Sequence, residues 1–153
     1  MTKMEEKVQK TSKSVEIAKK VVKYWLPVIL WAVVIFSFSA KPTTRTSEIY
    51  WQDFLVKKSA HVFEYGILTI LLFRALKKGG IEKKEAGVYS VILAVLYALS
   101  DEFHQSFTPG REPTLRDVFF DTTGSFLAVY IIWRYLPKAP KKLRTLAERL
   151  EIV

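Results

Sequence analysis

Four apolar blocks, separated by short stretches rich in charge, run along the sequence. They cover approximately residues 21–38, 60–76, 86–99 and 117–136, and the third continues as SDEFHQ to Gln105. At 1.5 Å of rise per residue, helices of about 17–20 residues span about 26–30 Å, roughly the thickness of a bilayer's hydrocarbon core. The pattern therefore predicts an all-α polytopic membrane protein, built as a bundle of four transmembrane helices.

Two other interpretations of this pattern are weaker. A soluble helical bundle would give each helix a polar face, and residues 26–38 and 67–73 show none. The segment at residues 37–40 (SFSA) resembles the small-residue cleavage site of a signal peptide. The block before it is long, however, contains two tryptophans and is followed by three further apolar blocks.

The basic residues predict an orientation for this bundle. Of the 24 Lys and Arg residues, 18 lie in residues 1–23, 74–84 and 134–149, which four spans place on one side of the membrane. The loops predicted on the other side hold only six. Since cytoplasmic loops carry the excess of Lys and Arg, we expect both termini in the cytoplasm.

The same pattern divides the chain into a membrane domain and two flanks. Residues 21–137 form the four-helix transmembrane domain, preceded by a basic segment at 1–20 and followed by an amphipathic basic segment at 138–153. We expect both flanks, together with residues 49–55 before the second helix, to lie along the membrane interface rather than across it.

Composition and charge narrow the class of partner. Hydrophobic residues make up 50% of the chain and charged residues 25%, and the formal net charge is +9. The basic residues flank the apolar blocks, which favours anionic lipid headgroups over nucleic acid as the partner. The absence of cysteine excludes disulfides and thiolate metal sites. We expect a multi-pass membrane protein whose oligomeric state is open.

Ionisable residues gather where the alternating topology brings three helix ends together. The second helix starts, the third ends and the fourth starts on the predicted outer side. The residues there are Lys58, His61, Glu64 and Tyr65; Asp101, Glu102, His104 and Gln105; and Arg111, Arg116, Asp117 and Asp121. Ionisable groups within membrane segments are costly unless they face each other or a wet cavity, so this convergence predicts a functional site.

Helical spacing indicates that these groups face inward. Ala86, Ser90, Ala94 and Ala98 recur every four residues and form a stripe that lets another helix pack closely. Glu102 continues the stripe. On the second and fourth helices the polar residues likewise recur at spacings of three and four. Those of the fourth helix share a face with small residues.

The candidate residues have two classes of role. As candidate acids, bases or nucleophiles we take His61, Glu64, Asp101, Glu102, His104, Asp117 and Asp121. As candidate substrate-binding residues we take Lys58, Tyr65, Gln105, Arg111 and Arg116. In the first class, His104 held by Asp101 or Asp117 would serve as a general acid or base.

Simpler roles compete with these. Asp117 lies three positions after Thr114 and would close an acidic version of a capping box. The two arginines would pair with neighbouring carboxylates, and either histidine would be a hydrogen-bonded anchor. A metal held by His61, His104 and one carboxylate is weaker, because the chain lacks a typical ligand spacing. The sequence leaves cofactors and metals undetermined.

At these residues the chain resembles the VanZ-like family of small bacterial membrane proteins. The resemblance is carried by VIFSFSAKP at residues 34–42, KSAHVFEYGILTILLFRAL at 58–76 and SDEFHQSFTPGREPTLRDVFFDTTGS at 100–125. It implies about four transmembrane helices and an envelope role linked to reduced sensitivity to the glycopeptide teicoplanin. Its motif residues also include Pro109, Gly110 and Gly124.

Three hypotheses follow for function. The first is a protein that recognises or modifies a membrane-linked anionic molecule, a lipid or cell-wall precursor, at the outer leaflet. The second is a non-catalytic scaffold or binding protein whose polar cluster is structural. The third is a transporter, which four short helices without an internal repeat disfavour. Whether the protein is an enzyme stays open at this point.

Overall fold

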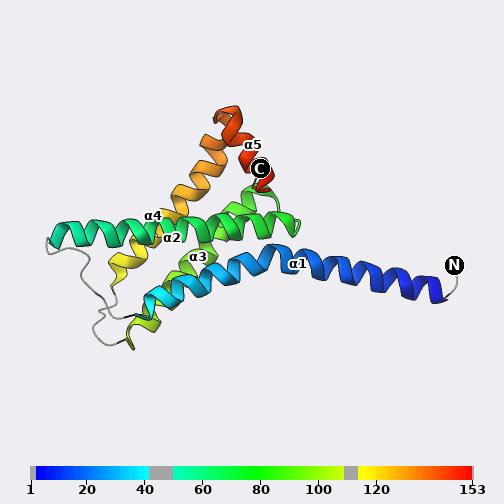
Figure 1. Ribbon diagram of the computed structural model, residues 1–153, viewed down its shortest axis with the longest axis horizontal. Helices are drawn as coiled ribbons and strands as arrows, with labels where there is room; N and C mark the ends of the chain where they lie inside the picture. The colour runs from blue at the N-terminus through cyan, green and yellow to red at the C-terminus, as the bar shows by residue number, and fades with distance from the viewer. Residues whose placement is uncertain (1–2, 42–49, 109–113, 153) are drawn as a thin grey trace.

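The computed structural model describes residues 3–41, 50–108 and 114–152, and within these ranges the chain is helical and contains no strand. Its elements in chain order are α1 (Lys3–Ser39), α2 (Tyr50–Lys78), α3 (Lys83–Gln105), α4 (Leu115–Tyr130), the π-helical turn η1 (Ile131–Tyr135), the 3-10 helix η2 (Leu136–Lys138) and α5 (Lys141–Arg149) (Figure 1). The predicted all-α class is confirmed.

Three of the helices are long and apolar enough to cross a membrane. The candidate spans are Ser12–Ser39, Trp51–Lys78 and Lys83–Gln105. The fourth predicted block forms α4, an α-helix of 16 residues that continues into η1 and η2. Pro137 lies at the start of η2, and since proline lacks a backbone N–H it cannot continue the α-helical hydrogen bonding.

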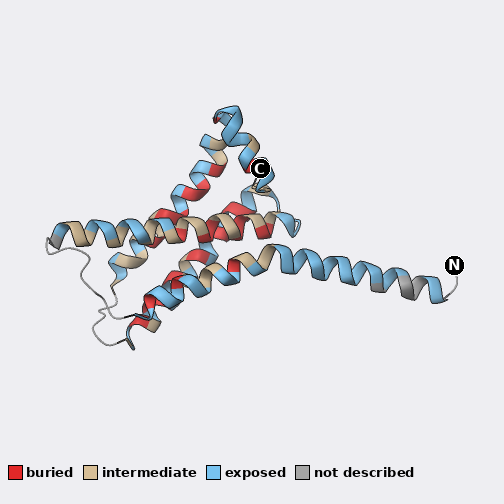
Figure 2. Ribbon diagram, viewed as in Figure 1, coloured by how far each residue is buried: buried red, intermediate tan, exposed pale blue. Residues whose placement is uncertain are grey.

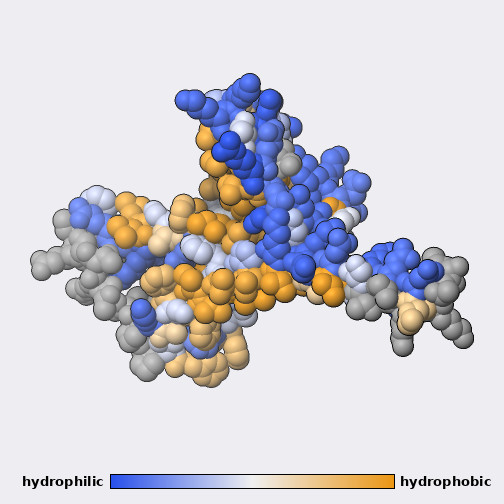
Figure 3. Space-filling model, turned by 45° about the vertical axis from the view of Figure 1, so that its right-hand side comes forward, coloured by the Kyte–Doolittle hydropathy of each residue, from blue (hydrophilic) through white to orange (hydrophobic). Residues whose placement is uncertain are grey.

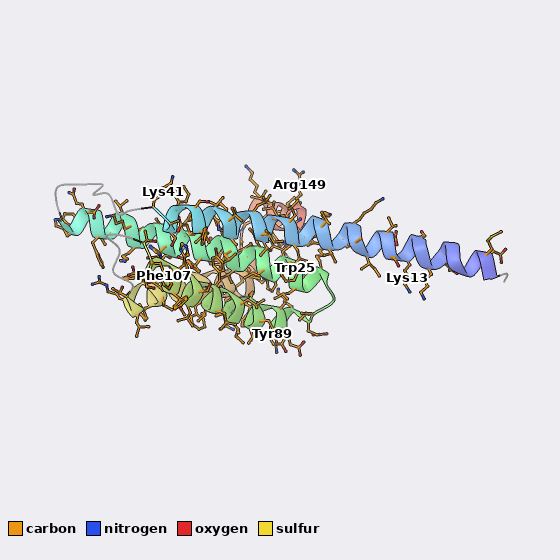
Figure 4. The ribbon with its side chains drawn as sticks, turned by 90° about the horizontal axis from the view of Figure 1, so that it is seen from below. Lys13, Trp25, Lys41, Tyr89, Phe107 and Arg149 are labelled. Carbon is orange, nitrogen blue, oxygen red and sulfur yellow. The ribbon has the colours of Figure 1, made fainter. Side chains whose placement is uncertain are left out.

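Helix α2 lies at the centre of the arrangement. It packs against α1, α3 and α4, and its contact with α4 is the most extensive in the fold. Figure 1 shows α4 crossing α2 obliquely, and Figure 4 shows α1, α2 and α3 side by side. The N-terminal part of α1 projects beyond the bundle, and residues 12–23 are exposed (Figure 2).

Two helix boundaries differ from the predicted ones. Helix α2 begins at Tyr50, about ten residues before the predicted start, so residues 50–55 belong to the same helix as the second apolar block; their place along the membrane interface stays a prediction. Residues 51–60 hold no glycine or proline, and Lys57 pairs with Asp53 one turn earlier at 2.8 Å, which stabilises the helix. The basic N-terminal segment likewise forms one continuous helix with the first apolar block.

The predicted small-residue stripe lies at the centre of the packing. Ala86, Ser90, Ala94 and Ala98 are all fully buried, because α3 turns this face toward α2 and α4. Beside the stripe, a Cβ atom on Gly87 would lie 2.2 Å from the indole of Trp133. Small residues on α3 therefore set how closely the other helices approach it.

Large apolar side chains cover much of the outer surface. Phe63, Phe126 and Ile29 are 67%, 61% and 56% exposed, and they belong to three different helices. Figure 3 shows hydrophobic residues over the middle of the molecule and hydrophilic residues toward α5 and the projecting part of α1. So much exposed apolar area is unusual for a soluble monomer and fits a surface in contact with lipid.

Candidate functional site: a buried ionisable cluster between α2, α3 and α4

Two ion pairs join α2 to α4. The Lys58 ammonium contacts the Asp117 carboxylate, and His61 Nδ1 shares a hydrogen bond of 2.9 Å with Asp121 Oδ1. Lys58 and His61 are three residues apart on α2, and their partners are four residues apart on α4. The two pairs therefore lie about one helical turn apart. Asp121 is 2% exposed, which makes it the most deeply buried charged group of the cluster.

Helix α3 adds two carboxyl groups to the same region. Gln105 Nε2 donates to Asp101 Oδ2 at 2.9 Å, and the backbone N–H of Thr114 donates to Glu102 Oε2 at 2.9 Å. The second oxygen of each carboxyl group is buried and has no hydrogen-bond partner among residues 3–41, 50–108 and 114–152. These two oxygens are therefore available to a further donor.

The four carboxyl groups form one electrostatic unit. Glu102 lies within electrostatic range of Asp101, Asp117 and Asp121, and Asp121 lies within range of Asp101 and Asp117. Among the described residues, the basic side chains that pair with these carboxyl groups are those of Lys58 and His61. The cluster is thus rich in acid and favours a bound cation or hydrogen-bond donor at its unpaired oxygens.

Tyr65 closes the cluster toward the interior of the bundle. Its side chain is fully buried, and its hydroxyl has no partner among the described residues. The Tyr97 ring lies 6.2 Å from it, and the Tyr97 hydroxyl donates to the carbonyl of Ala32 on α1 at 2.6 Å. A buried phenol without a partner is costly, so Tyr65 is a further polar group poised for a ligand or water.

A glycine sets the distance between α2 and α4. A Cβ atom on Gly124 would lie 2.2 Å from the backbone oxygen of Val62, so no larger residue fits there without moving a helix. Val62 follows His61, and Gly124 comes three residues after Asp121. The close approach of the two backbones therefore holds the His61–Asp121 pair together.

His104 takes no part in these ion pairs. Its ring stacks on Phe36 of α1 with centroids 4.4 Å apart, and its Nδ1 is buried without a partner among the described residues. The predicted contact of His104 with Asp101 or Asp117 is not observed among the described residues, where Gln105 donates to Asp101 and Lys58 pairs with Asp117. Of the two predicted histidines, the structure places His61 in the ion-paired cluster.

The remaining predicted residues have different surroundings. The backbone carbonyl of Glu64 accepts a hydrogen bond from the Trp31 indole at 2.9 Å, and this fastens α2 to α1. The Arg116 guanidinium lies over the ring of Phe54 at 5.2 Å, so its predicted pairing with a carboxylate is not observed. Arg111, with Pro109 and Gly110, lies outside the described residues.

The capping role considered for Asp117 is also not observed. Thr114 is the N-cap residue of α4, as predicted, but its side chain makes no capping hydrogen bond. Glu102 of α3 accepts the N–H of Thr114, and Asp117 turns to Lys58. These two contacts tie the start of α4 to α3 and to α2. The periodicity of a single helix cannot predict such contacts between helices.

The described residues contain no arrangement of side chains suited to bind a metal ion. No group of three His, Asp or Glu side chains there is placed to hold a metal ion. The alternative built on both histidines needs them together, and His104 stacks on α1 whereas His61 faces α4.

These features define the class: an all-α membrane protein with a buried ionisable cluster near one end of its helices. A family model described as VanZ/LLP1 matches residues 11–136, which include every residue of the cluster. The chain belongs to the VanZ/LLP1 family, in agreement with the resemblance of its motifs. No curated protein and no solved structure matches the chain. Helix α5 lies beyond the matched region.

Proposed function

We propose that this protein crosses the bacterial plasma membrane four times, with both termini in the cytoplasm. Contacts of Glu151 near the C-terminus support this topology. Glu151 pairs with Arg74 at 3.0 Å and with Lys23 at 3.2 Å, so the C-terminus lies near the start of the α1 span and the end of α2. Since α4 begins at the ionisable cluster, the chain from α4 to α5 passes from one end of the bundle to the other.

The cluster then lies toward the outer leaflet. Helices α2 and α4 start there and α3 ends there, whereas the Lys- and Arg-rich segments lie at the opposite end. The excess of basic residues at that opposite end favours its cytoplasmic placement. A molecule reaching the cluster would come from the outer half of the membrane.

We propose that the cluster recognises or modifies a membrane-linked anionic molecule, a lipid or cell-wall precursor. A hydroxyl or amine group of this molecule donates to the unpaired carboxyl oxygens, while its negative charge faces Arg116, beside the acid-rich cluster. The observation that carries this proposal is the His61–Asp121 pair at 2.9 Å beside two buried, unpaired carboxyl oxygens. Asp121 fixes the tautomer and orientation of the ring, which leaves Nε2 of His61 to exchange a proton with the bound molecule. Through this activity the protein would lower sensitivity to teicoplanin.

The second candidate function is that of a non-catalytic binding protein. It is favoured by the complete pairing of Lys58 with Asp117 and by the contact of Glu102 with the start of α4, since both fix helices in place. In that case the same residues would contribute to stability alone. The two candidates differ in whether activity and stability change together.

Conservative substitutions separate the two candidates. We expect Asp121→Asn and His61→Gln to abolish protection against teicoplanin in a bacterium that depends on this protein, with unchanged abundance in the membrane. Thermal unfolding in detergent should shift by only a few degrees. Glu148→Gln, at an exposed carboxylate of α5, is the control and should have no effect.

Two results would decide against proton transfer. Full protection by both variants would show that the pair is not needed. A loss of protection that follows the loss of thermal stability across the variants would support the binding protein.

A further inference from the structure

A groove runs along the outside of the helix pair that carries the cluster. Its volume is about 530 Å³, within the range of small-molecule sites. The lining residues all belong to α2, α4 and η1, and they include Phe54, Lys58, Phe63, Gly66, Gly124 and Leu127. Apart from Lys58 and Ser59, this lining is apolar or glycine.

The polar residues gather at one end of the groove. The Lys58 ammonium lies 5.8 Å from the ring centre of Phe54, and the Arg116 guanidinium lies 5.2 Å from the same ring. From Lys58 to Ile70 the groove follows about 18 Å of α2, and its far part is wholly apolar. The Arg116 guanidinium, which forms no ion pair among the described residues, therefore stands at the mouth of a long hydrocarbon surface, beside the Lys58 ammonium that Asp117 neutralises.

The shape of the groove follows from two glycines. Gly124 lets the backbones of α2 and α4 touch beside Val62, and this contact forms the floor. Gly66 leaves the space beyond it open, since a Cβ atom there would only reach ordinary contact with the carbonyl oxygen of Gly124, at 3.5 Å. Phe63 and Leu127 form exposed rims, so the groove opens sideways toward the bilayer.

We propose that this groove binds the alkyl chain of an anionic lipid, with the lipid headgroup at Arg116. The distribution of charge matches such a molecule, because a guanidinium without an ion-pair partner among the described residues lies at the headgroup level and hydrocarbon contacts lie below. The inference rests on the proposed function, since it places the substrate's chain in the groove and its headgroup beside the His61–Asp121 pair. It names the substrate class as a single lipid anion held along α2 and α4.

Photolabelling of the protein in nanodiscs tests this proposal. The probe is phosphatidylglycerol with a diazirine in its acyl chain, diluted in phosphatidylcholine; phosphatidylcholine with the same chain is the neutral comparison. We expect phosphatidylglycerol to label residues 59–70 and 120–131 about fivefold more than the neutral lipid does, as one unneutralised basic residue near the surface gives.

Three variants sharpen the test. Gly66→Leu fills the groove and should remove most labelling there, whereas Gly66→Ala adds a methyl that makes only ordinary contact and should keep it. Arg116→Gln changes an exposed side chain, which preserves the fold, and should abolish the preference for the anionic lipid. This last variant keeps the proposal testable if Gly66→Leu fails to fold.

Three outcomes would overturn it. Equal labelling by the two lipids, or labelling spread evenly over α1 and α3, would indicate ordinary surrounding lipid. Little labelling of residues 59–70 and 120–131 by either lipid would indicate that another surface, such as a second copy of the chain, covers the groove. Labelling is measured without any resistance phenotype, so it tests the lipid site alone. The His61→Gln and Asp121→Asn variants test the proposed function separately, and the failure of one proposal is therefore distinguishable from the failure of the other.

Discussion

The two ends of the bundle use ionisable residues in opposite ways. At one end, four carboxyl groups lie near Lys58 and His61, and several of their polar atoms are buried without partners among the described residues. At the other end, the carboxylate of Glu151 accepts ion pairs from three basic side chains, those of Arg74, Lys23 and Lys78. The first end is acid-rich and buried, and the second is basic and open to solvent.

The two ends differ in how completely their polar groups are paired. Around Glu151 the carboxylate is fully matched, and the Tyr24 hydroxyl adds a further hydrogen bond at 3.2 Å. The arrangement needs no ligand to be complete. At the cluster the buried unpaired oxygens and the Tyr65 hydroxyl carry an energetic cost that a bound molecule would relieve.

The backbone at Glu151 supports this view of the basic end. Glu151 has a φ of 59°, the left-handed conformation that glycine adopts most easily, and it follows the end of α5. The N–H of Ile152 donates to the carbonyl of Ala147, and that of Glu151 to Glu148, as in a Schellman motif. A glutamate at this position accepts backbone strain so that its side chain can reach Lys23 and Arg74.

Gly124→Ala should have the largest effect on this comparison. The added methyl would lie 2.2 Å from the backbone oxygen of Val62, and no side-chain rotation relieves a clash with backbone. We expect a loss of about 3 kcal/mol or more in stability, at the upper end of overpacking costs, and loss of the His61–Asp121 pair. Thermal unfolding in detergent measures the first and a structure of the variant the second.

Gly66→Ala is the matched control, since its methyl would meet the carbonyl oxygen of Gly124 at 3.5 Å. It should leave stability unchanged or raise it, because alanine favours a helix over glycine by about 1 kcal/mol. Equal destabilisation by both variants would contradict the role given to the close helix approach.

Much of the acid-rich end follows from the sequence, and the reason is periodicity. The stripe from Ala86 to Ala98 fixes one face of α3, and Glu102 continues it at the same spacing, so both are buried as predicted. The alternation of apolar blocks brings the ends of three helices together. Neither step requires knowledge of how the helices cross.

The parts that were not predicted depend on neighbours. His104 comes two residues after Glu102 and turns to another side of α3, where Phe36 of α1 stacks on it. Periodicity names a face but not the helix that covers it. The role of Glu151 was equally hidden, because its three basic partners are 73 or more residues away along the chain.

A double-mutant cycle on Lys58 and Asp117 sharpens the comparison next. We expect Lys58→Met and Asp117→Leu each to cost about 2 kcal/mol, below the full cost of breaking a buried pair, because the side chains are 13% and 15% exposed. The double variant should recover most of that loss, since it leaves no unpaired charge. Thermal unfolding of the four proteins gives the coupling, and additive losses would contradict an interacting pair.

Glu151→Gln should have a smaller and more local effect. It removes the charge shared by Lys23 and Arg74, so the segment at residues 143–152 should exchange its amide hydrogens faster while the helix cores stay protected. Glu151→Gly relaxes the backbone but also removes the side chain, so faster exchange there as well would assign the effect to the ion pairs. Glu148→Gln is the control and should exchange like the parent protein.

The smallest predicted effect is the response of this end to acid. Arg74 first and Lys23 second lower the pKa of Glu151 to about 2, from an ordinary value of 4.5. Since the carboxylate is the stabilised form, its contribution is complete above pH 4.5 and is lost as the pH falls toward 2. Protection factors of residues 143–152 should therefore decrease across this interval in the parent protein. They should stay level in Glu151→Gln.

Because Lys23 is 57% exposed, added salt should weaken the same contact at neutral pH. An acid response that persists in Glu151→Gln would mean that other groups hold the C-terminal segment, and the basic end would then lose its simple contrast with the cluster.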